Sequence, residues 1–173
     1  MITDFSKYAV KANEFLSDVA EKLGDRDDKA RASRVIRAFF HSIRNHITLE
    51  ENFQLLAQLP LILKGLYVDG WMPLKQKPKS STKNSFIEEM VNEDRSAGDD
   101  FTNPGEVIFS AKAVFGALGK YISKGELEDI KNVLPHELKE LVSNDQEAGD
   151  AEELVIITIT DNVSVPGDPG RNQ

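Results

Sequence analysis

The chain has 173 residues, no cysteine and a formal net charge of −8, with a pI near 4.9. A chain of this length can bury roughly 70% of the surface that its unfolded form exposes, so it needs no metal or disulfide to be stable. The lack of cysteine excludes disulfides, thiolate metal sites and cysteine nucleophiles, and fits a reducing compartment. The acidic balance argues against general nucleic-acid binding, because the phosphates would be repelled.

The first twenty residues carry charges throughout and lack the apolar core of a signal peptide. No apolar run in the sequence is long enough to span a bilayer. We therefore expect a cytoplasmic protein with no membrane partner.

Helical periodicity predicts two helices in the first part of the chain, over about residues 8–23 and 29–46. Gly24 is a plausible stop for the first, because glycine tolerates the left-handed conformation that often ends a helix. Thr48 and Glu51 have the spacing of a capping box, in which each side chain binds the other residue's backbone amide. The capping box predicts a third helix that runs to about Gln58.

A proline interrupts the apolar run "LAQLPLILKGLY" at Pro60. Proline disfavours the helical conformation of the residue before it, and it is well tolerated at the first position of a helix. We therefore predict a corner at Leu59 and a fourth helix that starts at Pro60.

The same pattern returns 75 residues later. Matching pairs include Phe40 and Phe115, Glu51 and Glu126, Leu55 and Ile130, Pro60 and Pro135, and Leu63 and Leu138. Ser123 and Glu126 form a second capping box, and Pro104 after Asn103 is predicted to start another helix. The sequence thus predicts an all-α fold of two pseudo-repeated units of about four helices each, which form a compact helical bundle.

Composition divides the chain into four segments. Residues 1–71 hold the first repeat, 72–83 a linker with four lysines and no acid, and 84–143 the second repeat. Residues 144–173 form an acidic and β-prone tail, in which Val155–Thr160 are all isoleucine, valine or threonine. We expect this tail to be flexible or a hairpin, and to pair with another chain if it functions at all.

No motif in the sequence carries catalytic or metal-binding chemistry. The three histidines, His41, His46 and His136, do not stand at the spacing of metal ligands. The sequence also lacks a Gly-x-Ser-x-Gly nucleophile motif and a glycine-rich phosphate loop. We therefore assign no catalytic residue, cofactor or metal ligand, and expect that the protein is not an enzyme.

Two groups of side chains remain as candidate sites. Arg34, Arg37, His41 and Arg44 fall within an arc of about 80° on the second predicted helix, opposite its apolar residues. We interpret this basic row as an exposed face, which is either simply solvated or a site for an anion or an acidic partner. Tyr67 and Trp71 are interpreted as an aromatic cover between the repeats, the alternative being a ligand pocket there.

One family resembles this sequence. The string "LLAQLPLILKGLYVDGW", followed a repeat later by "ISKGELEDIKNVLPHELKELV", is similar to the bacterial family known as domain of unknown function 2267, over about residues 10–142. The resemblance implies an all-helical, doubled fold. It implies almost nothing about function.

These observations favour a non-enzymatic interaction or scaffold module of unknown biological role. Its partner would be another protein, or a second copy bound through the tail. Two alternatives stay open. One is a small-ligand carrier or enzyme with a pocket at the seam between the repeats. The other is weak binding of nucleic acid or another anion through the basic row.

Overall fold

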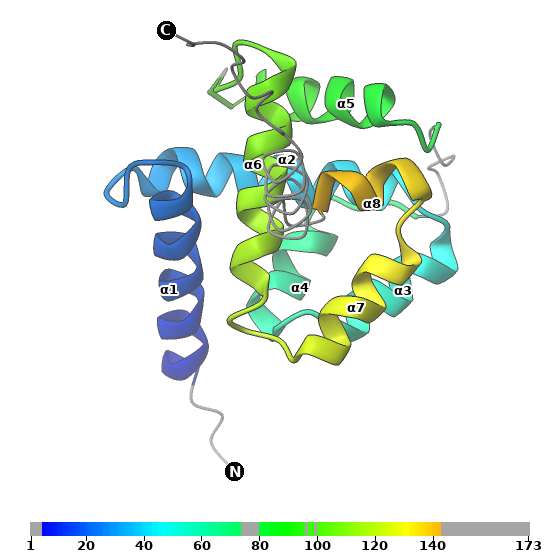
Figure 1. The fold of residues 1–173 in the computed structure, drawn as a ribbon. Coiled ribbons are helices and arrows are strands. Elements are labelled where there is room, and N and C mark those ends of the chain that lie inside the picture. The colour runs from blue at the N-terminus through cyan, green and yellow to red at the C-terminus, as the bar shows by residue number, and fades with distance from the viewer. Residues whose placement is uncertain (1–4, 74–79, 96, 99, 143–173) are drawn as a thin grey trace, which may run out of the picture. The chain divides into compact units, whose positions relative to one another are not determined.

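The computed structural model describes residues 5–73, 80–95, 97–98 and 100–142. These residues form eight α-helices and no strand (Figure 1), which confirms the predicted all-α fold. The helices are α1 Ser6–Lys22, α2 Lys29–His46, α3 Leu49–Gln58, α4 Leu61–Val68, α5 Lys83–Arg95, α6 Pro104–Leu118, α7 Lys124–Val133 and α8 His136–Val142. The predicted strand at Val155–Thr160, the rest of the tail and half of the basic linker, residues 74–79, lie outside the described residues.

The helix ends follow the local sequence signals. Both capping boxes are present: the hydroxyls of Thr48 and Ser123 each accept a backbone amide hydrogen from the glutamate three residues on, whose carboxylate accepts in return. The backbone turns a corner at Leu59, where ψ is 144°. Pro60 caps α4 instead of starting it, with an extended ψ of 149°, so α4 begins one residue later than predicted. Pro104 starts α6, as predicted.

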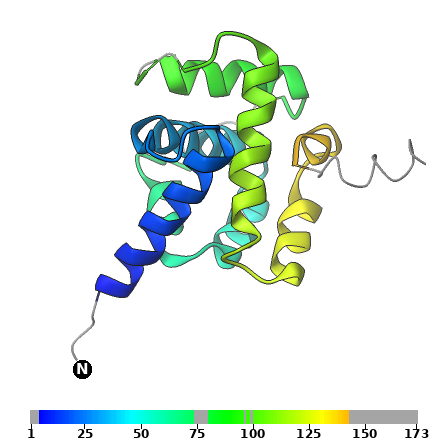
Figure 2. The same ribbon diagram turned by 60° about the vertical axis from the view of Figure 1, so that its left-hand side comes forward.

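The two repeats, α1–α4 and α5–α8, interleave. Helix α2 of the first repeat packs against α5 of the second, and α6 of the second packs against α1 of the first. Helices α3 and α7 lie side by side, as do α2 and α6 (Figures 1 and 2). Exchanging the two repeats converts the α2–α5 pair into the α6–α1 pair, and it leaves the α3–α7 and α2–α6 pairs unchanged. The packing therefore has the pattern of a pseudo-two-fold axis, as a doubled sequence would give.

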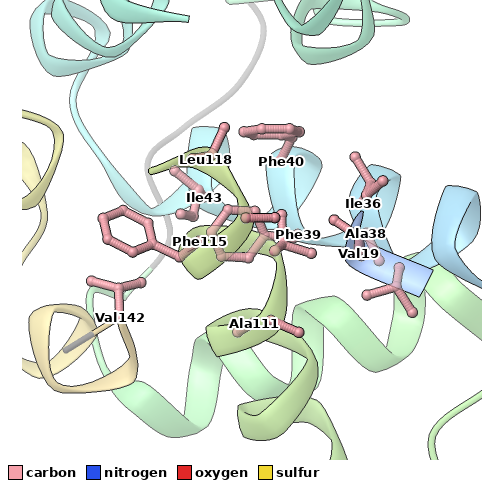
Figure 3. Packing of buried hydrophobic residues seen from close by; sticks show 14 of the residues in the cluster. Val19, Ile36, Ala38, Phe39, Phe40, Ile43, Ala111, Phe115, Leu118 and Val142 are labelled. Atoms are coloured by element: carbon pink, nitrogen blue, oxygen red, sulfur yellow. The ribbon is translucent and has the colours of Figure 1, made fainter. Parts of the chain in front are cut away.

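The repeats share one hydrophobic core. Phe39 and Phe40 of α2 are each 1% exposed, and they lie beside Phe115 and Leu118 of α6 (Figure 3). Phe86 of α5 meets Phe39 edge to face, with ring centroids 6.3 Å apart. Because aromatic side chains bury the largest apolar areas, these contacts across the repeats dominate the core. We infer that the described helices fold as one unit.

Candidate functional site

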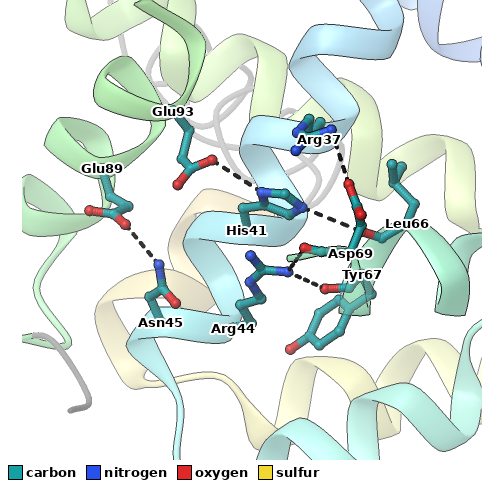
Figure 4. Close-up of polar contacts among 9 residues, drawn as sticks. All are labelled: Arg37, His41, Arg44, Asn45, Leu66, Tyr67, Asp69, Glu89 and Glu93. Atoms are coloured by element: carbon teal, nitrogen blue, oxygen red, sulfur yellow. Dashed lines mark hydrogen bonds and ion pairs between the residues drawn. The ribbon is translucent and has the colours of Figure 1, made fainter. Parts of the chain in front are cut away.

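The basic row lies at the junction of three helices. His41 is 3% exposed and Arg44 is 6% exposed, so the prediction that the row follows an exposed side is wrong for these two residues. Helix α5 of the other repeat packs along this side of α2, and the C-terminal end of α4 adjoins it (Figure 4). The sequence of α2 alone could not show this burial, because α5, which covers this side, belongs to the other repeat.

The first two arginines of the row, Arg34 and Arg37, form ion pairs within the chain. Arg34 binds the carboxylate of Asp100 through Nε and Nη2, at 2.6 and 2.8 Å. This pairing raises the pKa of Arg34 and lowers that of Asp100. Arg37, whose side chain is 51% exposed, lies 3.1 Å from the carboxylate of Asp69. Both charges are thus neutralised within the chain.

Arg44 holds the C-terminal end of α4. Its Nη1 donates to the backbone carbonyls of Tyr67 and Asp69, the latter at 2.8 Å. The last carbonyls of a helix have no partner within the helix, and a cation near them is favourable. Burial lowers the pKa of Arg44. The role of Arg44 is therefore structural, since its charge is directed at the chain's own backbone.

Asn52 of α3 hydrogen-bonds backbone carbonyls at the junction between α2 and α3. Its Nδ2 donates to the carbonyls of Arg44 and Thr48, at 3.0 and 2.9 Å. Its Oδ1 accepts a hydrogen bond from the hydroxyl of Tyr67. Arg44 and Asn52 therefore fix α2, α3 and α4 to one another through helix ends.

His41 links α5 to α4 across α2. Its Nδ1 lies 3.1 Å from Oε2 of Glu93, and its Nε2 lies 3.3 Å from the carbonyl of Leu66 (Figure 4). Both neighbours are acceptors, and an imidazole donates from both nitrogens only when it is protonated. The hydrogen bond with His41 lowers the pKa of Glu93 below its ordinary value.

This pair predicts a loss of stability in acid. A lowered pKa means that the contribution of Glu93 is fully present above about pH 4.5, its ordinary pKa, and is lost as the pH falls through the folded value. We expect Glu93→Gln to flatten the fall in unfolding free energy below that pH, measured by urea unfolding at a series of pH values. Glu88→Gln, at an exposed position of α5, is the control. Equal slopes in both variants would contradict the assignment.

Tyr67 and Trp71 lie within the first repeat. Tyr67 is fully buried, and its ring meets Phe40 at 5.9 Å and Trp71 at 6.0 Å. Trp71 also meets Phe53, at 6.4 Å. These ring contacts all lie within the first repeat, so the pair packs on the core of that repeat. Its role as a cover between the repeats stays a prediction. The full burial of Tyr67 also removes it as a ligand-contacting residue.

The structure has a groove between α1, α2 and α4 that the sequence did not predict. It has a volume of about 500 Å³, within the usual range of binding pockets. Its apolar lining is Ala12, Phe15, Leu16, Ile36, Ile62, Leu63, Gly65 and Leu66, and its polar lining is Asn13, Ser33 and Asp69. We call it the α1–α4 groove. It lies within the first repeat, and neither Tyr67 nor Trp71 lines it.

The outer face of α4 extends this apolar surface. Leu61, Ile62 and Val68 are 54%, 43% and 43% exposed. The positions 75 residues later, on α8, hold His136 in place of Leu61 and Glu137 in place of Ile62. The second repeat therefore has polar residues where the first repeat has an apolar surface, and this difference is the signal in the sequence that could have indicated the surface.

Among the described residues, no group of three or more histidines and carboxylates could hold a metal ion. None of the helices in the described part of the chain is long and apolar enough to cross a membrane.

Comparison with known proteins gives one finding. No curated protein matches the chain. A family model described as "Uncharacterized conserved protein (DUF2267)" matches residues 12–141, which is well over half of the sequence. The match confirms the resemblance seen in the Leu-Pro repeats, and it begins at Ala12, inside α1. The chain therefore belongs to the family of uncharacterized conserved proteins DUF2267.

Proposed function

We propose that this protein is a non-enzymatic interaction module of the cytoplasm, which binds a helical segment of another protein along α4 and the α1–α4 groove. The observation that carries the proposal is the exposure of Leu61 and Ile62 at positions where the second repeat has His136 and Glu137. Contiguous exposed apolar surface on a folded domain commonly marks a binding site.

A helix suits this surface better than a small molecule. An amphipathic helix in a groove places apolar anchors at a spacing of three and four residues, and covers the walls as well as the floor. Leu61 and Val68 lie on α4 outside the lining of the groove. A small ligand confined to the groove would leave both side chains exposed, whereas a helix laid against α4 would cover them.

The basic row gives less support to anion or nucleic-acid binding. Arg34 and Arg37 are paired with Asp100 and Asp69, and Arg44 is buried against backbone carbonyls. An incoming phosphate would have to displace these partners before it could form ion pairs with the arginines. We therefore place the binding surface on α4 and not on this side of α2.

The test replaces two exposed apolar residues of α4 by the residues that stand at the matching positions of α8. A phage-displayed library of amphipathic helical peptides is selected on the natural chain, and binding is then compared with the Leu61→His/Ile62→Glu double variant. We expect selected peptides to carry apolar residues at helical spacing and to bind the variant at least about tenfold more weakly, because central apolar anchors supply most of an interface's energy.

The matched control is His136→Leu/Glu137→Ile on α8, which leaves α4 unchanged and should leave peptide binding unchanged. Far-UV circular dichroism checks that both variants remain helical. Failure to select any peptide, or equal binding to the natural chain and the Leu61→His/Ile62→Glu variant, would contradict the proposal.

A further inference from the structure

Helix α1 extends beyond its counterpart in the second repeat. Phe15 of α1 matches Phe86 of α5 in the sequence, so Ala12 corresponds to Lys83, where α5 begins. Helix α1 begins earlier, at Ser6, and its first turns stand clear of the other helices (Figure 2). The family match also begins at Ala12. Residues 5–11, which we call the α1 ridge, are therefore an addition to the shared repeat.

The α1 ridge is apolar on the side that continues the core. Phe5, Tyr8 and Ala12 follow one another at helical spacing and lead into the buried Phe15 and Val19. Phe5 is 68% exposed, and Tyr8 and Ala12 are only partly covered. An apolar stripe that runs out of the core along a projecting helix lacks a packing partner among the described residues.

We propose that the cover is a second copy of this chain, whose α1–α4 groove receives the α1 ridge while its own ridge enters the groove of the first. This inference rests on the proposed function of the groove, and it names one occupant. Ala12 belongs to the apolar stripe of α1 and also lines the groove, so ridge and groove adjoin on the same surface. A surface that carries both can pair with itself around a two-fold axis, with each contact made twice.

Charge supports the same pairing. The α1 ridge carries Lys7 and Lys11 and no acid, whereas the second half of α1 carries three acids, Glu14, Asp18 and Glu21, and one basic residue, Lys22. Of these acids, Asp18 also pairs with Lys120 of the same chain. An antiparallel approach of two α1 helices puts the basic end of each beside the acidic half of the other, and it also opposes the two helix dipoles favourably. A parallel approach would bring like charges together.

The size of the surface predicts a weak dimer. Ridge and groove together offer about twenty residues from each copy, which is at the lower end of specific protein interfaces. Sedimentation equilibrium of the full chain over a wide concentration range should therefore show a reversible rise from the mass of one chain, 19.3 kDa, towards that of two.

Single variants then test the two halves of the contact. Tyr8→Glu alters the ridge and Ile62→Glu alters the groove, and we expect each to raise the dimer dissociation constant at least about tenfold. Phe109→Glu is the matched control. Phe109 is 52% exposed, but it lies on α6 of the second repeat and lines neither the ridge nor the groove, so this variant should dimerise like the natural chain.

Mixing the two impaired variants is the decisive step. A Tyr8→Glu copy keeps a natural groove and an Ile62→Glu copy keeps a natural ridge, so their mixed dimer contains one fully natural contact and should form more tightly than either variant alone. Circular dichroism confirms that each variant is helical. A chain that stays monomeric, a Tyr8→Glu variant that dimerises normally, or a mixture that gains nothing would overturn the inference. None of these results would affect peptide binding by the groove, which the Leu61→His/Ile62→Glu variant tests separately.

Discussion

Replacing Arg44 by methionine should destabilise the protein by about 3 kcal/mol, because removing one member of a buried charged group leaves its partners without a donor. Methionine fills a similar space but cannot donate to the carbonyls of Tyr67 and Asp69, which end α4. The side chain is buried, so water replaces those hydrogen bonds poorly. The expected fall in Tm is on the order of 10 °C, measured by differential scanning calorimetry.

Arg37→Met provides the control for this prediction. Arg37 stands on the same helix but is half-exposed, and its ion pair with Asp69 should contribute no more than about 1 kcal/mol. A loss of stability for Arg44→Met as small as that for Arg37→Met would show that the buried contacts to α4 matter little.

Phe86→Ala should cost about 3 to 5 kcal/mol, the usual range for removing a buried phenylalanine. Phe86 belongs to the second repeat, but its ring meets Phe39 and His46 of the first. If the interleaved helices form one unit, this loss must lower the stability of both repeats together.

The single tryptophan gives a direct way to see this coupling. Trp71 lies in the first repeat, so its fluorescence reports on that repeat during guanidinium unfolding, while circular dichroism reports on all helices. We expect the two transitions to coincide in the Phe86→Ala variant, both shifted to lower denaturant. A tryptophan transition that stays in place while part of the helical signal is lost earlier would mean that the repeats unfold separately.

Local signals in the sequence predicted the helices well. Capping boxes involve residues only three positions apart, and the effect of Pro60 falls on its immediate neighbour, so both can be deduced without knowing the fold. The repeat itself followed from matched residues along the chain. These features explain why the helix order, the Leu59 corner and the start of α6 were all predicted.

The site could not be predicted in the same way, because it depends on which helices meet. His41 and Arg44 looked exposed when α2 was considered alone, and only the packing of α5 and the end of α4 shows that they are buried. A comparison between repeats held a clue: the positions of His41 and Arg44 are glycines in the second repeat, Gly116 and Gly119. The second repeat keeps a basic residue at the position of Arg37, Lys112, but it has no side chain at the two positions that are buried in the first repeat.

The same comparison explains the proposed function. Two copies of one helical pattern fold around a common core, and their outer surfaces then differ, since α4 is apolar where α8 is charged. The core that both repeats share accounts for stability. The surface that differs between them, on α4 and the α1–α4 groove, is where we place binding.

Chemical-shift mapping by NMR tests this placement most directly. The isotope-labelled chain is titrated with a selected helical peptide at a concentration low enough to keep the chain monomeric. The account predicts that the largest shifts fall on Gly65 and Leu66 of α4 and on Leu16 of α1, while Glu140 of α8 does not move. Largest shifts on α5 or α8, or on the basic row of α2, would contradict it.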